Sequence, residues 1–589
     1  MRNGRLLIAV LFTSLAVAAP AAQADSPYPP LPPATYQTVS RDVFLPMDDG
    51  VKIAMTVTQP SLDGQTPAPG KFPVILGMTP YGRDGACSCP SAATFAPRGI
   101  AVAVADVRGT GGSGGNLNEN YFSPREQKDG AALVEWLGTQ SWSNGKVGMA
   151  GGSYVGITQY LVAEQQPPHL AAIAPAVALS DLYEDAYTHS GIPDIFFDAQ
   201  YIAVQGGPGL LTPNKDPAAA QQTLEAKTQQ AQGTPIALDY LQRPNDGPFY
   251  RDRSPWYRVD RIKVPVLAID GWRDGFVRGN LEMYQALAQR KGVETLINLG
   301  PCTHKGCGAP FAPFTNGTDL DDLTALQFDF FRRHLMGQDT GPRSNVRYYV
   351  QGEDAYHEAT AWPPPQAKFV RFYLDHGTIA TERPASPGAE SYFTNPAAGL
   401  SMAFDEYGTI AASPYVPTDQ RAEEEQGITW RTPPLEQPLT LAGPTQLHLV
   451  ASSSAPNTDW IAKLADVAPD GSESIVAEGY LRASHRTLDK ARSTLGNPYH
   501  DNEHPTPLEP GAVYPFDIAI YPTAYRLAAG HRLQLRLTTI DMPTHLPASY
   551  RIDRNDPSSV SVVPLLPATN TVQEGGRRPS SLLLPVLGG

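Results

Sequence analysis

The sequence has little charge, little cysteine and no apolar run long enough to span a membrane, and each shortage excludes a class of protein. Charged residues make up 18% of the 589 residues, with 45 basic against 59 acidic side chains, so the formal net charge is −14. A chain this acidic is a poor partner for nucleic acid or for an anionic membrane surface. The longest apolar stretch, Leu6–Ala18, is too short to cross a bilayer. We therefore expect no nucleic-acid partner and no membrane span.

The first 24 residues instead have the composition of a secretory signal peptide. Arg2 and Arg5 form its basic part, Leu6–Ala18 its apolar part, and Ala22-Gln23-Ala24 a small-residue cleavage site. We expect a secreted or periplasmic protein whose mature chain begins at Asp25. An uncleaved membrane anchor is the alternative interpretation.

Only four cysteines are present, and export makes disulfides the first interpretation of them. They form two distant clusters, Cys87 with Cys89 and Cys302 with Cys307. Zinc is the competing interpretation, but this spacing without an accompanying histidine pair is poor for a zinc site. A bridge within Cys87-Ser88-Cys89 would close a very small ring. We therefore expect the two clusters to be cross-linked, in either pairing.

The order of strands and helices predicts an α/β-hydrolase architecture with a doubly wound sheet and a second, all-β domain. Buried parallel strands are expected in the first part, because short apolar runs bounded by turn residues alternate with helical patterns. After about residue 347 the helical patterns give way to short strands and turns, which are typical of a jelly roll. The expected parts are a signal peptide (1–24), the α/β core in two pieces (35–179 and 251–346), a helical cap (180–250) and the jelly-roll domain (347–589).

The expected elements have the following ranges. Strands are predicted at 39–44, 54–59, 72–77, 100–106, 146–150, 171–177, 264–269, 294–299, 446–451, 460–467 and 533–538, and helices at 127–137, 157–164, 218–232, 279–290 and 320–336.

The strongest functional signal is Gly151-Gly152-Ser153-Tyr154-Val155-Gly156, which joins a predicted strand to a predicted helix. A serine between small residues at such a turn is how an α/β-hydrolase exposes its nucleophile. The usual G-x-S-x-G pattern is altered here, because Val155 stands where the second glycine is expected and Gly156 follows it. A plain glycine-rich turn is the alternative for this segment taken alone.

A nucleophilic serine needs a histidine base and a carboxylate that orients the base, in the chain order Ser, Asp, His for this fold. Asp274 follows the predicted strand 264–269, and His304 follows the next strand, 294–299. Both are therefore the expected partners of Ser153. Asp270, nearer the strand end, is the rival acid.

Two hydrogen-bond donors must stabilise the oxyanion of the reaction. The backbone amide of Tyr154 is the first, because of its place in the turn. The second should come from the loop after an early strand, Met78–Arg83, where Tyr81 offers its hydroxyl; a tyrosine that merely packs is the alternative. The run Arg108–Gly115 lacks the Gly-Lys-Ser/Thr ending of a phosphate loop, so a structural turn is expected there.

Several of these segments together resemble one family. They are Met78–Arg83, Asp106–Gly115, Glu135-Trp136-Leu137, Gly-Gly-Ser-Tyr-x-Gly at 151–156, Gly271-Trp272-x-Asp274 and Gly300-Pro301-x-x-His304. The chain resembles the family of bacterial cocaine esterase and X-prolyl dipeptidyl-peptidase, which includes α-amino-acid ester hydrolases and glutaryl-cephalosporin acylases. Asn457-Thr458-Asp459 and Tyr521–Arg526 look like motifs of its C-terminal domain.

The resemblance implies Ser153, Asp274 and His304 as the catalytic triad, with Tyr81 and the amide of Tyr154 as oxyanion donors. It also implies a helical cap and a C-terminal jelly roll. The pattern Gly-x-Ser-Tyr-x-Gly accounts for the displaced glycine. Such chemistry needs no metal and no organic cofactor, and the expected partner is a small-molecule or short-peptide acyl substrate.

The choice of substrate leaves alternatives open. An esterase or acylase is favoured over an X-Pro dipeptidyl-peptidase or α-amino-acid ester hydrolase, which would need carboxylates to bind an ammonium group. Candidate carboxylates lie in the cap segment and could equally be ordinary surface charges; they are Asp181, Glu184, Asp185 and Asp198. From another class, a secreted glycan-binding protein with an inert hydrolase domain is the competing hypothesis.

Overall fold

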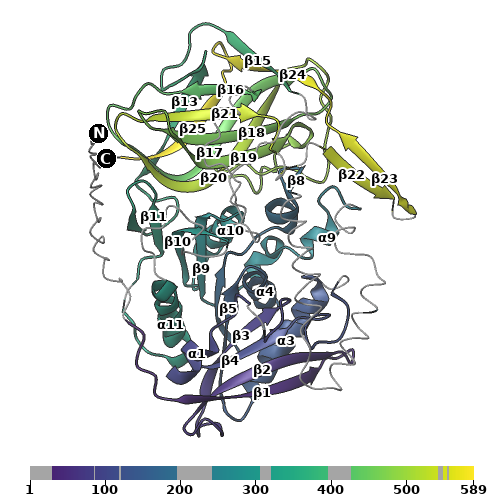
Figure 1. Ribbon diagram of the computed structural model, residues 1–589, viewed down its shortest axis with the longest axis vertical. Helices are drawn as coiled ribbons and strands as arrows, with labels where there is room; N and C mark the ends of the chain where they lie inside the picture. Colours follow the sequence, from purple (N-terminus) through teal and green to yellow (C-terminus); the bar gives the residue numbers. More distant parts are fainter. Residues whose placement is uncertain are drawn as a thin grey trace, which may run out of the picture.

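A computed structural model describes residues 30–84, 87–117, 121–194, 228, 242–304, 320–341, 343–394, 426–541, 545, 548–553 and 556–588. Two bodies rich in β-strands lie one above the other (Figure 1). The lower body, purple to teal, is an α/β domain, and the upper body, green to yellow, is a β-domain. The predicted signal peptide lies outside the described residues. Within the described ranges, no helix combines the length and the apolar character needed to cross a membrane.

The α/β domain is built on one ten-stranded sheet. Its order across the sheet is β1-β2-β4-β3-β5-β6-β9-β10-β11-β12. The central strands β4 to β11 run parallel, and the outer pairs are antiparallel. The strand bounds are β1 Gln37–Pro46, β2 Lys52–Ser61, β3 Phe72–Thr79, β4 Ala101–Asp106, β5 Ser143–Gly152, β6 Leu170–Ala176, β9 Val266–Arg273, β10 Thr295–Thr303, β11 Val346–Val350 and β12 Ala355–Ala359.

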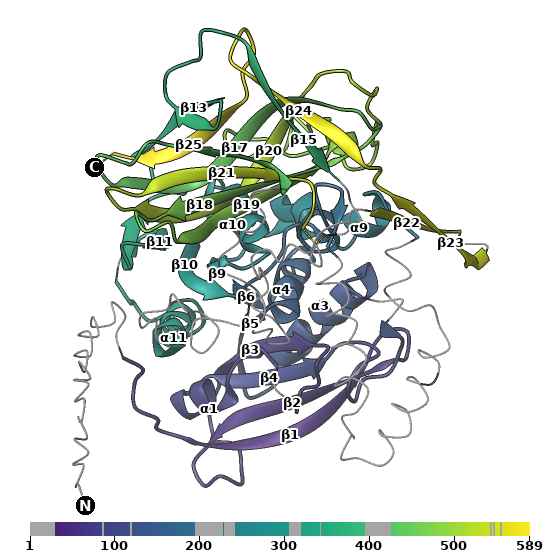
Figure 2. The ribbon, with the colours of Figure 1, turned by 45° about the horizontal axis from the view of Figure 1, so that its top comes forward.

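Helices cover both faces of this sheet, which is why a central strand can be buried along its whole length. Every residue of β3 is buried. On one face α3 (Pro124–Thr139), α4 (Tyr154–Ala163) and α10 (Val277–Ala288) share a core with the strands, and on the other α1 (Ala92–Phe95) and α11 (Leu320–Met336) do. Figure 2 shows this layering. The predicted doubly wound architecture is confirmed, and α11 has the predicted bounds.

The β-domain is a single eleven-stranded sheet that closes on itself, because β25 pairs with both β13 and β17. Its interior is filled by large apolar side chains such as Trp430 and Trp460, both fully buried. The predicted all-β C-terminal domain is thus confirmed. The strand bounds are β13 Ala367–Asp375, β14 Thr378–Ala380, β15 Gly388–Thr394, β16 Ile428–Arg431, β17 Leu439–Ser453, β18 Asp459–Val467, β19 Glu473–Arg482, β20 Tyr514–Leu527, β21 Arg532–Thr538, β24 Ala568–Glu574 and β25 Ser581–Leu587.

Two small hairpins stand apart from the large sheets. One is β7 (Thr188–His189) with β8 (Ile192–Pro193), and the other is β22 (Ala548–Asp553) with β23 (Asp556–Pro564), which projects from the β-domain at the right of Figure 1. The short helical elements are η1 Ala96–Arg98, a π-helical turn η2 Tyr183–Tyr187, α9 Pro248–Arg251, η3 Pro255–Arg261 and η5 Ala483–His485.

The predicted helical cap falls largely outside the described residues, including nearly all of the predicted helix 218–232. Its described parts are 180–194, residue 228 and 242–250; the first and last of these contain the π-helical turn, the β7–β8 hairpin and the start of α9.

Candidate active site

Ser153 stands on a sharp turn between β5 and α4. Its backbone has φ 58° and ψ −126°, a conformation that residues with a side chain rarely adopt and that stores strain. A Cβ atom at Gly156 would stand 2.4 Å from the carbonyl oxygen of Ala176 in β6, so only glycine fits there. The altered spacing of the motif therefore has a steric reason, because α4 begins in close contact with the neighbouring strand.

Ser153, His304 and Asp274 lie in one hydrogen-bonded row. His304 Nε2 is 2.8 Å from Ser153 Oγ, and His304 Nδ1 is 2.7 Å from Asp274 Oδ2. The other oxygen of Asp274 accepts a hydrogen bond of 2.6 Å from the amide of Phe276, whose ring meets the His304 ring edge to face. The three side chains come from the carboxyl ends of the parallel strands β5, β9 and β10, which meet at one edge of the sheet.

Asp270, the rival acid, has other partners. Its Oδ2 accepts a hydrogen bond of 2.8 Å from the side chain of Asn280, and its Oδ1 accepts one of 2.8 Å from the amide of Gly271. Burial, together with the nearby charge of Asp274, raises the pKa of Asp270 well above its usual range. The carboxylate that contacts His304 is therefore that of Asp274.

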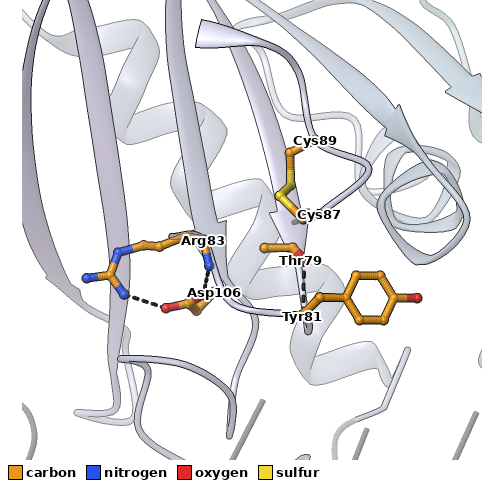
Figure 3. Close-up of a disulfide and its surroundings, with 6 residues drawn as sticks. All are labelled: Thr79, Tyr81, Arg83, Cys87, Cys89 and Asp106. Carbon is orange, nitrogen blue, oxygen red and sulfur yellow. Dashed lines mark hydrogen bonds and ion pairs between the residues drawn. A yellow bond between two sulfur atoms is a disulfide. The ribbon is translucent and has the colours of Figure 1, made fainter. Parts of the chain in front are cut away.

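Tyr81 projects from the loop after β3, and its backbone amide donates to the Thr79 hydroxyl (Figure 3). Burial raises the pKa of the Tyr81 phenol to about 12, while hydrogen bonds with the Ser153 side chain and the Tyr154 backbone oppose the rise. The phenol is therefore un-ionised at neutral pH and can donate a hydrogen bond. It stands beside the Tyr154 amide, next to the predicted nucleophile.

The same loop is anchored to the end of β4. Both the backbone amide and the guanidinium of Arg83 bind the Asp106 carboxylate, at 2.6 Å and 2.5 Å (Figure 3). The amide of Gly112 donates to the same carboxylate at 2.8 Å. The glycine-rich run after Asp106 thus wraps around a carboxylate of its own chain, as the interpretation as a structural turn predicts.

The disulfide prediction was wrong. Cys87 is bonded to Cys89, so the two predicted clusters are not cross-linked through these sulfurs (Figure 3). The chain bends at Ser88 enough to bring the two Cα atoms to 5.1 Å, within the span that a disulfide bridges, so the small ring closes. Cys302 is also in a disulfide, and Cys307 lies outside the described residues.

The Cys87–Cys89 loop packs against the turn that carries Ser153. The carbonyl oxygen of Ser88 accepts a hydrogen bond of 2.9 Å from the amide of Gly152. A cavity of about 250 Å³ opens between this loop, the ends of β5, β6 and β9, and helix α11, and His304 forms part of its wall. The disulfide therefore supports the backbone directly behind Ser153.

The side chain of Tyr154 is buried under the turn. Its hydroxyl is 2.9 Å and 2.7 Å from the two carboxyl oxygens of Glu126, at the start of α3. The ring stacks on Phe122 with centroids 4.1 Å apart and meets Tyr81 edge to face at 6.4 Å. Sequence reasoning did not identify Glu126, because nothing near it in the sequence marks a residue that faces the active-site turn.

The candidate amine-binding carboxylates Asp181 and Glu184 are buried and already paired with arginines. Asp181 is 2.6 Å from Arg492, and Glu184 is 2.7 Å from Arg278. Burial acts to raise the pKa of Asp181, but the Arg492 guanidinium outweighs it and holds the pKa below its usual value. Tyr499 donates a further hydrogen bond of 2.8 Å to Asp181.

Asp185 is held within its own turn. One carboxylate oxygen accepts hydrogen bonds from the amide and hydroxyl of Ser180 and from the amide of Asp181. Burial, with the neighbouring charges of Glu282 and Asp181, raises the pKa of Asp185 to about 7. Asp198, the fourth candidate, lies outside the described residues. The three described carboxylates serve a buried network between the α/β domain and the β-domain.

Residues 49–306 match the X-Pro dipeptidyl-peptidase (S15) family, and residues 340–583 match the C-terminal non-catalytic domain of X-Pro dipeptidyl-peptidase. The cocaine esterase of Rhodococcus sp. (strain MB1 Bresler) is 27% identical over 606 residues, which cover 93% of this chain and 99% of that protein.

Two solved structures share the fold. A CocE/NonD family hydrolase from Staphylococcus aureus aligns with a TM-score of 0.72 and 22% identity over 93% of each chain. An α-amino-acid ester hydrolase aligns with a TM-score of 0.75 and 22% identity, covering 97% of this chain and 100% of that one. With both domains of the S15 arrangement matched, the chain belongs to the cocaine esterase and X-Pro dipeptidyl-peptidase family of serine hydrolases.

Proposed function

We propose that the protein is a secreted hydrolase that cleaves an ester or amide bond through an acyl-enzyme formed on Ser153. The observation that carries this proposal is the continuous hydrogen-bonded row Asp274–His304–Ser153, with contacts of 2.7 Å and 2.8 Å. A serine hydroxyl becomes nucleophilic when an adjacent base can take its proton. Export is supported by the signal-like residues 1–24, with Asp25 as the first mature residue.

The reaction begins when His304 Nε2 takes the proton of Ser153 Oγ, which attacks the substrate carbonyl carbon. Asp274 keeps the Nδ1–H of His304 pointed toward itself, so that Nε2 faces the serine, and it stabilises the imidazolium that forms. The imidazolium then gives its proton to the departing alcohol or amine, which leaves the acyl group on Ser153. Water repeats the sequence, with His304 again as base, and releases the acid.

The negative charge on the tetrahedral intermediate would be stabilised by Tyr81 and by the amide of Tyr154. Fixed donors aimed at the developing oxyanion lower the barrier because they need no reorganisation during the reaction. The amide of Tyr154 lies at the N-terminus of the ten-residue helix α4, where the helix dipole adds to the stabilisation.

Among substrates, the pairing of the acidic residues favours an uncharged acyl group. A peptidase of free N-termini or an α-amino-acid ester hydrolase needs a carboxylate to receive the substrate ammonium. Asp181 and Glu184 already bind Arg492 and Arg278, and both are buried. Breaking such buried pairs to admit an amine would be costly. We therefore propose a carboxylesterase or acylase in preference to an X-Pro dipeptidyl-peptidase or amino-ester hydrolase.

The proposal is tested with a substrate panel on the purified mature chain. Short acyl esters, cephalosporin side-chain amides, amino-acid esters and X-Pro anilides are compared by kcat/KM, and each N-terminal amine is also supplied acetylated. We expect turnover of acyl substrates that carry no amine, and no loss when an amine is acetylated.

A preference for the free amine would favour the dipeptidyl-peptidase or amino-ester hydrolase instead. Ser153→Ala should abolish turnover, while Ser391→Ala, a change at an exposed hydroxyl in β15, should not. Glycan binding by the chain without any turnover would favour the non-enzymatic alternative.

A further inference from the structure

Glu126 is buried beneath the turn that carries Ser153, and no residue in the described part of the chain gives it a cationic partner. It is 2% exposed, and no cation within the described residues forms a salt bridge with it. Its backbone amide is held by the Ser123 hydroxyl at the N-terminus of α3, at 3.3 Å. A buried carboxyl without a counter-ion is costly unless it is neutral and hydrogen-bonded. Among the described residues, the side chain that hydrogen-bonds this carboxyl is that of Tyr154, through its hydroxyl, and the backbone of Phe122 adds a further hydrogen bond.

Contacts of 2.9 Å and 2.7 Å place that hydroxyl within reach of both carboxyl oxygens. A neutral carboxyl has one O–H donor and one C=O acceptor, so it can donate to the phenol and accept from it at once. Such a reciprocal pair satisfies both buried groups. It also fixes the far end of the Tyr154 ring.

The other end of the Tyr154 ring lies beside the proposed oxyanion donors. The Tyr154 backbone amide is one of the two proposed donors, and the ring packs edge to face against Tyr81, the other donor. Phe122 also stacks on this ring, with centroids 4.1 Å apart, and the Tyr121 ring packs against it at 5.7 Å. Tyr154 therefore carries one donor on its backbone and packs its ring against the other, and its hydroxyl is anchored on Glu126.

We propose that Glu126 is a positioning residue for the oxyanion hole, which it holds in place through Tyr154, and that it does so in its neutral form. This inference rests on the proposed acyl-transfer function of Ser153. Displacement of a catalytic group by about 1 Å can cost about 100-fold in rate. Loss of the Glu126 anchor should therefore lower kcat and leave KM nearly unchanged, because the oxyanion exists only after the substrate is bound.

The charge of Glu126 adds a pH dependence of known sign. Burial is the main reason that the pKa of Glu126 rises to about 8, with the nearby charge of Asp129 adding to it. Deprotonation would place a negative charge under the site where the oxyanion develops. The rate should therefore be highest while the carboxyl is neutral and should fall as the pH rises past about 8.

The other titratable groups around Glu126 are accounted for. Asp129, one turn later on α3, is paired with Arg108 at 2.8 Å and with Arg125 at 2.8 Å. Arg253, which lowers the Glu126 pKa slightly by its charge, donates to the backbone carbonyls of Tyr121 and Phe249. Burial, together with the charge of Glu126, raises the pKa of Tyr154 well above its usual range, so this phenol stays neutral.

The test compares Glu126→Ala, Glu126→Gln and Tyr154→Phe with the wild type. Glu135→Gln is the matched control, because Glu135 lies on the same helix but pairs with His169 at the surface. The measurements are kcat and KM for an activated ester from pH 6 to 10, and the affinity for phenylboronic acid, which forms a tetrahedral adduct with an active serine.

We expect Glu126→Ala and Tyr154→Phe to lower kcat about tenfold or more and to weaken boronate binding by a similar factor, with KM changed less than about twofold. Glu126→Gln, which keeps a neutral hydrogen-bonding group, should restore most of kcat and remove the decline above pH 8. Glu135→Gln should match the wild type in both respects.

The inference is overturned if the Glu126 variants keep the wild-type kcat, boronate affinity and pH profile. It is also overturned if their melting temperature falls while kcat per fluorophosphonate-reactive site is unchanged, since that would be a purely structural role. Failure of the proposed function is a different result, in which the wild type itself neither turns over the ester nor reacts with fluorophosphonate.

Discussion

The carbonyl oxygen of Ser88 accepts a hydrogen bond from the amide of Gly152, the residue that precedes Ser153. Ser88 is the middle residue of the Cys87–Cys89 disulfide, so a covalent ring of three residues supports the strained turn from behind. This contact links the oxidation state of two cysteines to the position of the predicted nucleophile.

Removal of this disulfide should lower activity. In the double variant Cys87→Ser and Cys89→Ser, the Ser88 carbonyl loses its fixed position and the turn relaxes, so we expect kcat to fall several-fold. Steady-state kinetics on the oxidised proteins check this. The variant is a cleaner test than chemical reduction of the wild type, because it removes this disulfide alone and leaves Cys302 unaltered. Wild-type kcat in the variant would show that the turn needs no support from the ring.

Substitution of the two neighbouring carboxylates should have unequal effects. Asp274 contacts His304, so Asp274→Asn should lower kcat by about 10⁴-fold by favouring the wrong tautomer of the histidine. Asp270→Asn should cost about tenfold or less, because Asp270 contacts Asn280 and Gly271 instead. Measuring kcat for the two variants in parallel tests this. A larger loss in Asp270→Asn than in Asp274→Asn would make Asp270 the triad acid.

Tyr81→Phe removes one proposed oxyanion donor without changing the shape of the ring. Loss of a single donor of this kind typically costs about 10²–10³-fold in kcat. We expect that loss with little change in KM, as measured with the same activated ester. If KM rises while kcat is unchanged, Tyr81 contacts the bound substrate and not the oxyanion.

The buried contact between Asp181 and Arg492 should contribute to stability and not to amine recognition. Removal of one partner of a buried ion pair typically costs about 3–5 kcal/mol, so Asp181→Ala should lower the free energy of unfolding by about that amount. Urea denaturation measures this. The ratio of kcat/KM for an amino-acid ester to that for its acetylated form should not change, and a changed ratio would show that Asp181 reads the substrate amine.

The same pair predicts how stability changes with pH. In the folded protein the pKa of Asp181 is lower than in the unfolded chain, where an aspartate has a pKa of about 3.9. Its contribution is therefore fully present above about pH 4 and is lost as the pH falls through the folded pKa. Acid titration of wild type and Asp181→Ala should show the difference in stability shrinking below pH 4. A constant difference would contradict the ionised pair.

Much of the fold was predictable because the relevant signals are local. The period of apolar residues over 320–336 predicts α11 with its observed bounds, and the apolar runs at 72–77 and 100–106 predict the buried strands β3 and β4. The order of Ser153, Asp274 and His304 along the chain also predicts their meeting, since all three follow parallel strands of one sheet. Their catalytic roles stay a proposal.

What the sequence did not reveal depends on contacts between distant segments. The arginines that pair with Asp181 and Glu184 lie 311 and 94 positions away in the sequence. No local sequence pattern therefore distinguishes these paired carboxylates from unpaired ones. The Cys87–Cys89 pairing was missed because the contact that holds this loop, between Ser88 and Gly152, joins segments far apart in the sequence. Glu126 was missed for a similar reason, since its partner Tyr154 lies on another helix.

The central claim is that His304 makes Ser153 a nucleophile that carries the acyl group. It is tested most directly by trapping: the protein is mixed with a slowly deacylating ester, quenched in acid, and mapped by peptide mass spectrometry. The account predicts an acyl adduct on Ser153 in the wild type, formed far more slowly in His304→Ala and absent from Ser153→Ala. An adduct on another residue, or turnover that persists in Ser153→Ala, would contradict it.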